Sequence, residues 1–304
     1  IIKPNLSKLI YLESIPKIKK IIKSFSPDII HAHYASSYGL LATIINFRPF
    51  ILSVWGSDLY DFPRKNFINK WLINRVIQSA DCICSTSKAM AKIISEEYNR
   101  FDCKVIPFGI DTKLFIPTTQ NFLPFTIGTI KSIEEYNGID CLLNAARIII
   151  YDKKNINVKF LIIGKGTLLK KMQKKCKEFN LENYVKFEGQ ISHQKIVKYY
   201  QKISVFIAVS TRESFGVSVL EAASCGIPAI TSNIGGLPEV NVDEETGYLI
   251  PPNEPLILAE KITRLYEQKN LRSKMGDYAR KRVVEKFDWN MNVTQLINIY
   301  KSLG

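Results

Sequence analysis

Short apolar runs alternate with helical patterns along most of the chain. A first set of strands is indicated by DIIHAHY (residues 28–34), FILSVWG (50–56), DCICST (81–86) and KVIPFG (104–109). A second set is indicated by FTIGTI, VKFLIIG, YVKFEG, SVFIAVS and PAITS, between residues 125 and 232. Strands separated by helices in this way are typical of parallel sheets with helices on both faces. The pattern predicts an α/β fold with two doubly wound, Rossmann-like sheets.

The segment VIPFGIDTKLFIP (residues 105–117) breaks this alternation. Pro107, Gly109 and Pro117 interrupt any periodic pattern there, as expected of a linker between domains. After TGYLIPPN (residues 246–253) the pattern is helical to the end of the chain. We expect a first domain over residues 1–113, a second over 114–287, and a final helix over 288–304.

Composition narrows the class of protein. The 304 residues include 42 Lys and Arg against 28 Asp and Glu, so the formal charge of +14 favours anionic partners. Nucleic acid is not the expected partner, because the sequence contains no zinc spacing, recognition helix or aromatic-studded basic strand. The longest apolar stretch contains Asn46, Arg48 and Pro49, and the six cysteines follow no disulfide spacing. We therefore expect a cytoplasmic protein.

The densest basic segment is IPKIKKIIKSF, residues 15–25. Its Ile15, Ile18, Ile22 and Phe25 recur at helical spacing, with lysines off that stripe. The simpler interpretation is a helix that faces the core and has a solvated lysine face. The alternative is a basic amphipathic helix lying on an anionic membrane surface.

The stretch ESFGVSVLEAASCGIPAITS places Glu213 and Glu221 eight positions apart, around the predicted start of a helix. In open α/β sheets, ligands bind beyond the carboxyl ends of the strands. A helix N-terminus that begins beside Gly216 is suited to phosphate oxygens, and carboxylates are suited to sugar hydroxyls. The spacing therefore favours a nucleotide sugar as the ligand.

The fifty residues from Glu213 to Ile262 resemble the Glu-x7-Glu region of retaining glycosyltransferases of family 4, which have the GT-B fold. PDIIHAH, VWGSDLY, SADCICSTSKAM, IIGKG and YVKFEGQISHQKI also resemble landmarks of that family. The resemblance implies two Rossmann-like domains facing a cleft, with the C-terminal helix crossing back to the first domain. It also implies transfer of a hexose from a nucleotide diphosphate sugar, most simply a UDP-sugar, to a glycan or lipid-linked saccharide.

The resemblance assigns roles to individual residues. Glu213, Lys131 and His33 are the expected catalytic residues: Glu213 and His33 contact the donor sugar, and Lys131 contacts the phosphates. Asp58 is expected on the acceptor side. The expected donor-binding residues are Glu221, Ser214, Phe215, Gly216, Val217, Gly164 and Ile191. Lys131 departs from the family pattern, because Thr129 stands where relatives have an arginine and Asn137 where they have a lysine.

No cofactor or metal is expected. The sequence contains no Asp-x-Asp triplet, and His31 and His33 have no third ligand at a suitable spacing. His31 is more simply a core histidine. Gly164 and Gly166 resemble part of a dinucleotide fingerprint, but Leu169 takes the place of its third glycine.

Relatives begin with further strands and a glycine-rich loop before the equivalent of PDIIHAH, where this sequence has 27 residues before Asp28. The expectation is a first domain truncated at its start, with impaired transfer activity. The alternatives are a nucleotide-sugar epimerase of the same fold, or a fragment that binds the donor without transferring it.

Overall fold

The computed structural model describes residues 8–118, 124–152 and 157–304. The chain forms two compact units. Unit 1 comprises residues 1–107 and 292–304, and unit 2 comprises residues 108–291. The sequence instead predicts the boundaries after residue 113 and before residue 288.

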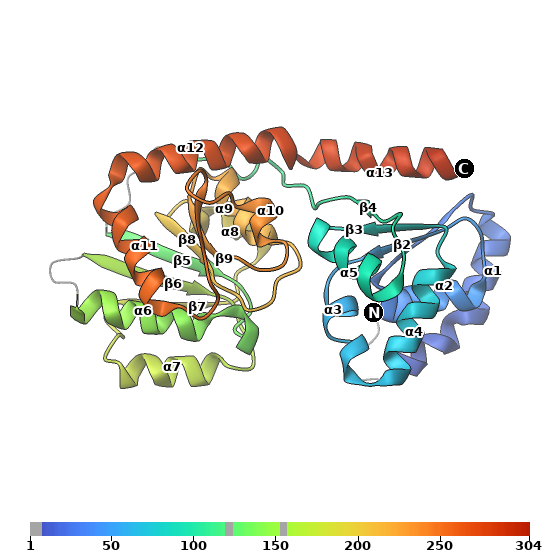
Figure 1. The fold of residues 1–304 in the computed structure, drawn as a ribbon, viewed down its shortest axis with the longest axis horizontal. Coiled ribbons are helices and arrows are strands. Elements are labelled where there is room, and N and C mark those ends of the chain that lie inside the picture. The colour runs from blue at the N-terminus through green and yellow to red at the C-terminus, as the bar shows by residue number, and fades with distance from the viewer. Residues whose placement is uncertain (1–7, 119–123, 153–156) are drawn as a thin grey trace. The chain divides into compact units, whose positions relative to one another are not determined.

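Unit 1 is built on a parallel sheet of four strands in the order β1-β2-β3-β4 (Figure 1). The strands are β1 (Ile30–His33), β2 (Phe50–Val54), β3 (Cys82–Ser85) and β4 (Lys104–Val105). The helical elements are η1 (Lys8–Ser14), α1 (Ile15–Phe25), the π-helical η2 (Tyr34–Gly39), α2 (Leu40–Ile45), α3 (Ser57–Tyr60), η3 (Pro63–Lys65), α4 (Phe67–Ser79) and α5 (Lys88–Tyr98).

The two faces of this sheet have different covers. On one face, Phe50, Leu52 and Val54 join buried residues of α2, α4 and α5 in a single hydrophobic cluster. On the other face, Ile51, Cys82 and Cys84 pack against Ile299, Tyr300 and Leu303 of the last helix, α13 (Trp289–Leu303). The alternation follows from the two-residue period of a strand. The C-terminal helix thus completes the core of unit 1.

The helix expected at residues 15–25 is present as α1, and it begins with a proline in its first turn. Ile15, Ile18 and Ile22 are half-buried, while Lys17, Lys20 and Lys23 are exposed. The stripe is therefore only partly covered by the protein: none of its residues is fully buried, and Phe25 at its end is exposed.

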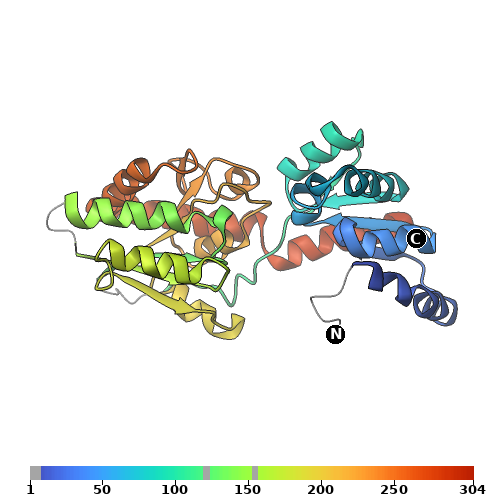
Figure 2. The ribbon, with the colours of Figure 1, turned by 90° about the horizontal axis from the view of Figure 1, so that it is seen from below.

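Unit 2 contains a parallel sheet of six strands in the order β10-β9-β8-β5-β6-β7 (Figures 1 and 2). The strands are β5 (Phe125–Ile130), β6 (Val158–Ile163), β7 (Val185–Gly189), β8 (Val205–Ala208), β9 (Ala229–Ser232) and β10 (Gly247–Ile250). This is the strand order of a doubly wound dinucleotide-binding fold.

Helices cover both faces of that sheet. One hydrophobic cluster joins it to α6 (Ile139–Asp152), α7 (Leu169–Glu178) and α11 (Pro255–Glu267). A second cluster joins the opposite face to α8 (His193–Tyr200), α9 (Val217–Ser224), α10 (Leu237–Val240) and α12 (Lys269–Lys286). The remaining short element, η4, spans Glu135–Asn137. The predicted α/β class with two parallel sheets is confirmed.

Candidate functional site

The strand order of unit 2 places a topological switch point between β5 and β8. From β5 the chain proceeds to β6 and β7 on one side, and from β8 to β9 and β10 on the other. The loops that leave β5 and β8 therefore diverge and open a crevice at the carboxyl edge of the sheet. Lys131 follows β5 directly, and Ser210 and Glu213 lie in the loop after β8.

Lys131 and Glu213 meet across this switch point. The Nζ of Lys131 donates a hydrogen bond to Ser210 Oγ at 2.8 Å and forms an ion pair with Glu213 Oε2. The two side chains are only 10% and 17% exposed. A lysine and a glutamate this far from water are tolerated because each neutralises the other. The structure thus brings together two of the residues predicted to be catalytic.

Three glycines allow the surrounding loops to pack closely. Gly164 has φ +144°, and a Cβ atom there would lie 1.8 Å from the carbonyl oxygen of Lys131. Gly235 has φ +51°, and its Cβ would lie 1.9 Å from the carbonyl oxygen of Glu213, while the N–H of Gly236 donates to that oxygen at 3.3 Å. These glycines therefore support the backbone positions of Lys131 and Glu213.

The loop from Ser214 to Val217 leads into α9. Phe215 is buried against the rings of Phe108 and Phe287, so its side chain anchors the loop in the core of unit 2. Gly216 precedes α9 with φ +112°, a conformation that other residues rarely adopt. The backbone around these residues is therefore held firmly at the start of α9.

Glu221 lies one turn into α9 and is mostly buried. Tyr200 donates its hydroxyl to Glu221 Oε2 at 2.5 Å, and His193 Nε2 lies 3.6 Å from Oε1. Burial raises the pKa of Glu221, and the Tyr200 hydrogen bond opposes that shift. Sequence reasoning missed Tyr200 and His193, whose only signal was that they stand in the segment after FEGQIS. Ile191, in the same loop region, is half-buried against the hydrophobic cluster that contains Tyr200.

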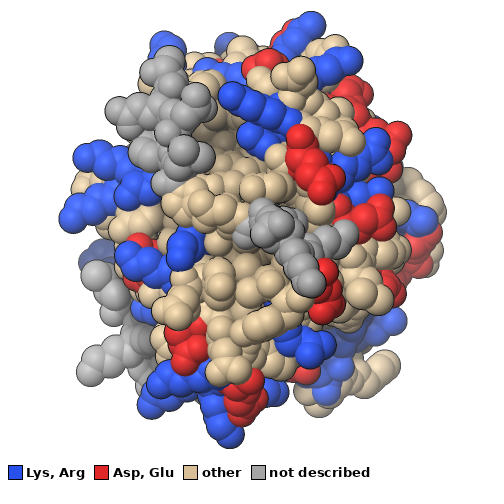
Figure 3. Space-filling view, turned by 90° about the vertical axis from the view of Figure 1, so that its left-hand side faces the viewer, with Lys and Arg blue, Asp and Glu red and all other residues tan. Residues whose placement is uncertain are grey.

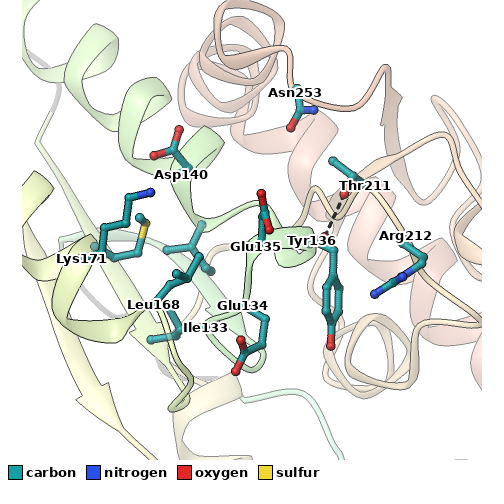
Figure 4. A pocket seen from close by; sticks show the side chains of 12 residues that line it. Ile133, Glu134, Glu135, Tyr136, Asp140, Leu168, Lys171, Thr211, Arg212 and Asn253 are labelled. Atoms are coloured by element: carbon teal, nitrogen blue, oxygen red, sulfur yellow. Dashed lines mark hydrogen bonds between the residues drawn. The ribbon is translucent and has the colours of Figure 1, made fainter. Parts of the chain in front are cut away.

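A cavity of about 710 Å³ opens beside the loops that follow β5 and β8. Its lining includes Glu134, Glu135, Tyr136, Thr211 and Arg212, but none of Lys131, Glu213 or Glu221. Figure 4 shows Glu135 and Tyr136 between Asp140 and Lys171 on one side and Thr211 and Arg212 on the other. The guanidinium of Arg212 lies 4.4 Å from the centre of the Tyr136 ring. This cavity is a neighbour of the Lys131–Glu213 pair and not part of it.

In unit 1, His33 ends β1 and packs against two other rings. Its ring centre lies 4.1 Å from that of His31 and 5.2 Å from that of Trp55. Burial lowers the pKa of His33, and its Nδ1 atom is buried with no hydrogen-bond partner among the described residues. Tyr34, which follows, has φ +82°, which is unusual for a large side chain and marks a constrained backbone at this strand end.

His31 has a structural environment, as expected. Its Nδ1 lies 2.7 Å from the hydroxyl of Tyr300 in α13, and its Nε2 lies 2.8 Å from Ser53 Oγ in β2. Burial, and then the neighbouring His33, lower the pKa of His31 to about 4. The neutral ring thus links two strands to the C-terminal helix.

Asp58 is fully buried in the structure. Its carboxylate accepts hydrogen bonds from the backbone N–H groups of Ala35 (2.9 Å), Gly56 (2.8 Å) and Trp55 (3.1 Å). Burial raises the pKa of Asp58, and these three bonds oppose that shift. The carboxylate therefore holds the loops that follow β1 and β2.

The described part of the chain contains neither a membrane-spanning helix nor a metal-binding cluster. No helix in residues 8–118, 124–152 or 157–304 is long and apolar enough to cross a membrane. The same parts of the chain contain no group of three or more His, Cys, Asp or Glu side chains placed to hold a metal ion.

Comparison with known protein families decides the class of the chain. Residues 113–282 match the model of glycosyl transferases group 1, and residues 2–87 match that of glycosyl transferase 4-like proteins. The chain belongs to the group 1 glycosyltransferases. The residues around Lys131, Glu213 and Glu221 all lie inside the matched region, so the crevice at the switch point is that of a glycosyltransferase domain.

Individual relatives agree with this assignment. The chain is 30% identical to an uncharacterized glycosyltransferase of Methanocaldococcus jannaschii, over 99% of this chain and 84% of that protein. It is 24% identical to the N-acetyl-alpha-D-glucosaminyl L-malate synthase of Bacillus anthracis, over 93% of this chain and 77% of that one. It is 25% identical to the D-inositol 3-phosphate glycosyltransferase of Corynebacterium urealyticum, over 91% of this chain and 72% of that protein.

Solved structures share the fold. The sucrose-phosphate synthase of Thermosynechococcus elongatus has a TM-score of 0.85 at 21% identity, over 100% of this chain and 80% of that one. The Anabaena protein HepE, solved in complex with UDP-glucose, has a TM-score of 0.82 at 21% identity, over 95% and 82%. The predicted GT-B class, with two Rossmann-like domains, is confirmed.

Proposed function

We propose that this glycosyltransferase moves a hexose from a UDP-sugar to a hydroxyl of a glycan or lipid-linked saccharide, with retention of configuration and without a metal ion. The observation that carries the proposal is the Lys131–Ser210–Glu213 cluster across the switch point of unit 2. A nucleotide diphosphate sugar needs a cation for its phosphates and an acceptor group for its hydroxyls, and this cluster offers both. The UDP-glucose complex of HepE supports the choice of donor.

In the proposed mechanism, the Lys131–Glu213 ion pair is the resting arrangement of the site. The diphosphate competes with Glu213 for the Lys131 ammonium, and Glu213 is then released to accept hydrogen bonds from the sugar hydroxyls. As the bond between the sugar carbon and the diphosphate oxygen breaks, Lys131 stabilises the negative charge on the leaving group. The acceptor oxygen forms the new bond to that carbon, and its proton leaves with the diphosphate.

The remaining site residues are assigned to donor binding. Glu221, oriented by Tyr200, accepts from the ribose hydroxyls. The backbone from Ser214 to Val217 faces the phosphates at the start of α9. Ile191 and the Gly164 loop border the nucleotide.

Two residues of unit 1 complete the proposal. His33 contacts the donor sugar in its neutral form, consistent with its lowered pKa. We assign Asp58 to holding the loop that carries Trp55 and not to direct contact with the acceptor, because its carboxylate already accepts three backbone hydrogen bonds.

The experiment measures UDP binding and sugar transfer in variants of the ion pair. Lys131→Met should weaken UDP binding and lower kcat/KM about 100-fold, the loss typical of removing a group that stabilises developing charge. Glu213→Gln should lower kcat by a similar factor but leave UDP bound at least as tightly, because the lysine no longer has a competing partner. Lys174→Met and Glu178→Gln, exposed on α7, are the matched controls. Weaker UDP binding in Glu213→Gln would contradict the exchange of partners.

The competing function is a nucleotide-sugar epimerase of the same fold. The named relatives support transfer instead, since two of the three are named glycosyltransferases and the third is named a synthase. UDP release from UDP-sugars with and without saccharide acceptors separates the two functions. Release that is equally fast without acceptor, together with conversion of the donor into its epimer, would favour the epimerase.

We also propose that the protein binds its lipid-linked acceptor at an anionic membrane surface. The formal charge of +14 and the exposed lysines of α1 support it.

A further inference from the structure

The start of α4 exposes three large apolar side chains within little more than one helical turn. Phe67 is 82% exposed, Ile68 66% and Trp71 51%. The opposite side of the same helix carries Ile73, Val76 and Ile77, which are buried in unit 1. Helix α4 is therefore apolar on two sides, and only one of them is needed for folding. Exposed single apolar residues are ordinary, but three together on one turn indicate an interaction surface.

The segment between Asp61 and Asp81, which contains this turn, carries only basic charges. Between Phe62 and Ala80 the chain contains Arg64, Lys65, Lys70 and Arg75 and no Asp or Glu. Arg64 pairs with Glu97 of α5 at 3.2 Å. Lys65, Lys70 and Arg75 are exposed, and no ion pair to them is found among the described residues. By contrast, the face of the molecule drawn in Figure 3 intersperses Lys and Arg with Asp and Glu.

The residue types agree with the charge. Amphipathic aromatic side chains such as Trp are enriched at the interface between a membrane and water. Lysine side chains at that interface extend their ammonium groups to anionic headgroups. A protein partner of similar size would be expected to offer acidic contacts against these lysines, but a bilayer containing anionic lipids supplies both the charge and the apolar layer. The chemistry of this turn thus fits a lipid surface.

We propose that the start of α4, with Phe67, Ile68 and Trp71 inserted between lipids and Lys65 and Lys70 on their headgroups, is the surface by which this protein docks on an anionic membrane. The inference rests on the lipid-linked part of the proposed function, and it moves the contact from α1 to α4. On α1, Ile15, Ile18 and Ile22 are half-buried and the exposed apolar residues are Ile21 and Phe25 near its end, whereas Phe67, Ile68 and Trp71 at the start of α4 are all exposed.

The test is sedimentation of the full chain with vesicles of phosphatidylcholine alone, and of phosphatidylcholine mixed with phosphatidylglycerol. The native protein should bind the anionic vesicles preferentially, and added salt should weaken binding. Phe67→Ser/Trp71→Ser should bind at least about tenfold more weakly at every salt concentration, because the lost contribution is apolar. Lys65→Gln/Lys70→Gln should lose most of the salt-sensitive part.

Phe25→Ser is the matched control, because Phe25 is 76% exposed on α1 of the same unit. It should bind vesicles within about twofold of the native protein. Equal losses in Phe25→Ser and in the α4 variant, or no preference of the native protein for anionic vesicles, would overturn the proposal. So would self-association in lipid-free buffer that Phe67→Ser/Trp71→Ser abolishes, since the occupant would then be a second copy of the chain.

A thermal-shift measurement with UDP on the same proteins separates this inference from the proposed function. UDP should stabilise all the α4 and α1 variants equally, because none of the changed residues belongs to the donor site. Absence of a UDP effect in the native protein would count against the donor assignment and leave the vesicle result to be judged by itself.

Discussion

Glu221 is a residue whose proposed role in ligand binding comes at the expense of stability. Its carboxylate is mostly buried, and burial is the largest cause of its raised pKa. A carboxyl group whose pKa is raised on folding is destabilising when ionised, that is, above its ordinary pKa. The carboxylate is nevertheless the acceptor that we propose for the ribose hydroxyls, and that role accounts for an ionised group at a destabilising position.

Replacing Glu221 by Gln should therefore separate the two effects. The neutral amide keeps an oxygen that can accept from Tyr200, so the ligand-free protein should become more stable by about 1 kcal/mol at pH 7, raising Tm by roughly 2–4 °C. UDP should bind roughly tenfold more weakly, because a charged acceptor is lost. Thermal unfolding and UDP titration measure these effects.

The direction of this stability change can be checked by measuring its dependence on pH. Below about pH 4, Glu221 is itself protonated, so the difference in stability between the native protein and Glu221→Gln should disappear. Glu182→Gln, at an exposed position, should show neither change. A loss of stability in Glu221→Gln at neutral pH would contradict this account of the buried carboxylate.

At the scale of elements, the site depends on contact between loops that leave neighbouring strands. The N–H of Lys131 donates to Ile163 O, and that of Ile133 donates to Lys165 O, so the loop after β5 lies along the loop after β6. Gly164 lies within this contact, where a side chain would meet the backbone at Lys131. The position of Lys131, the proposed catalytic lysine, therefore depends on a glycine that follows a different strand, β6.

Gly164→Ala should displace the loop that carries Lys131. Its Cβ would meet a backbone oxygen and not a flexible side chain, so we expect a loss of about 2–4 kcal/mol in stability and weaker UDP binding. Gly189→Ala is the matched control: it also has positive φ, at +72°, but nothing lies within 4 Å of its Cβ. That change should cost only about 1 kcal/mol, for the backbone strain. Equal costs in urea unfolding would show that backbone conformation and not crowding governs Gly164.

At the scale of the whole chain, His31 connects segments from both ends of the sequence. It joins β1 and β2 to Tyr300 of α13. Burial and the nearby His33 lower its pKa to about 4, below its ordinary value of 6.5. The unfolded chain therefore binds more protons than the folded chain between these two values, and stability must fall as pH falls through that window.

We expect unit 1 to lose on the order of 2 kcal/mol between about pH 7 and pH 4, after allowing for the partial exposure of His31. His31→Gln should be less stable than the native protein at pH 7 and should show a shallower pH dependence. Hydrogen exchange at amides of β1, β2 and α13 measures unit 1 separately from unit 2. An unchanged slope in His31→Gln would show that other groups, such as His33, cause the acid sensitivity.

The sequence by itself determined the fold class and the segments to which the proposed site residues belong. Short apolar runs predicted nine of the strands, β1 to β9, because a parallel strand that is buried on both faces consists of a short continuous run of apolar residues. The missed strand, β10, is a four-residue strand at the edge of its sheet and begins with Gly247, so its local pattern is weak. The Glu213 and Glu221 spacing was visible because both residues belong to one contiguous loop and helix.

Only the tertiary structure decided which distant residues meet. The Lys131–Glu213 ion pair, the Tyr200–Glu221 hydrogen bond and the contact of Gly164 with Lys131 each join segments that leave different strands, and sequence periodicity carries no information about such pairs. Sequence periodicity also does not determine which of these side chains are exposed to solvent. Asp58 has the sequence context of a ligand-binding residue but is buried, and Phe67 and Trp71 have the residue types of a core but are exposed. The packing of the rest of the chain, and not the local sequence, determines which side of a helix or loop faces water.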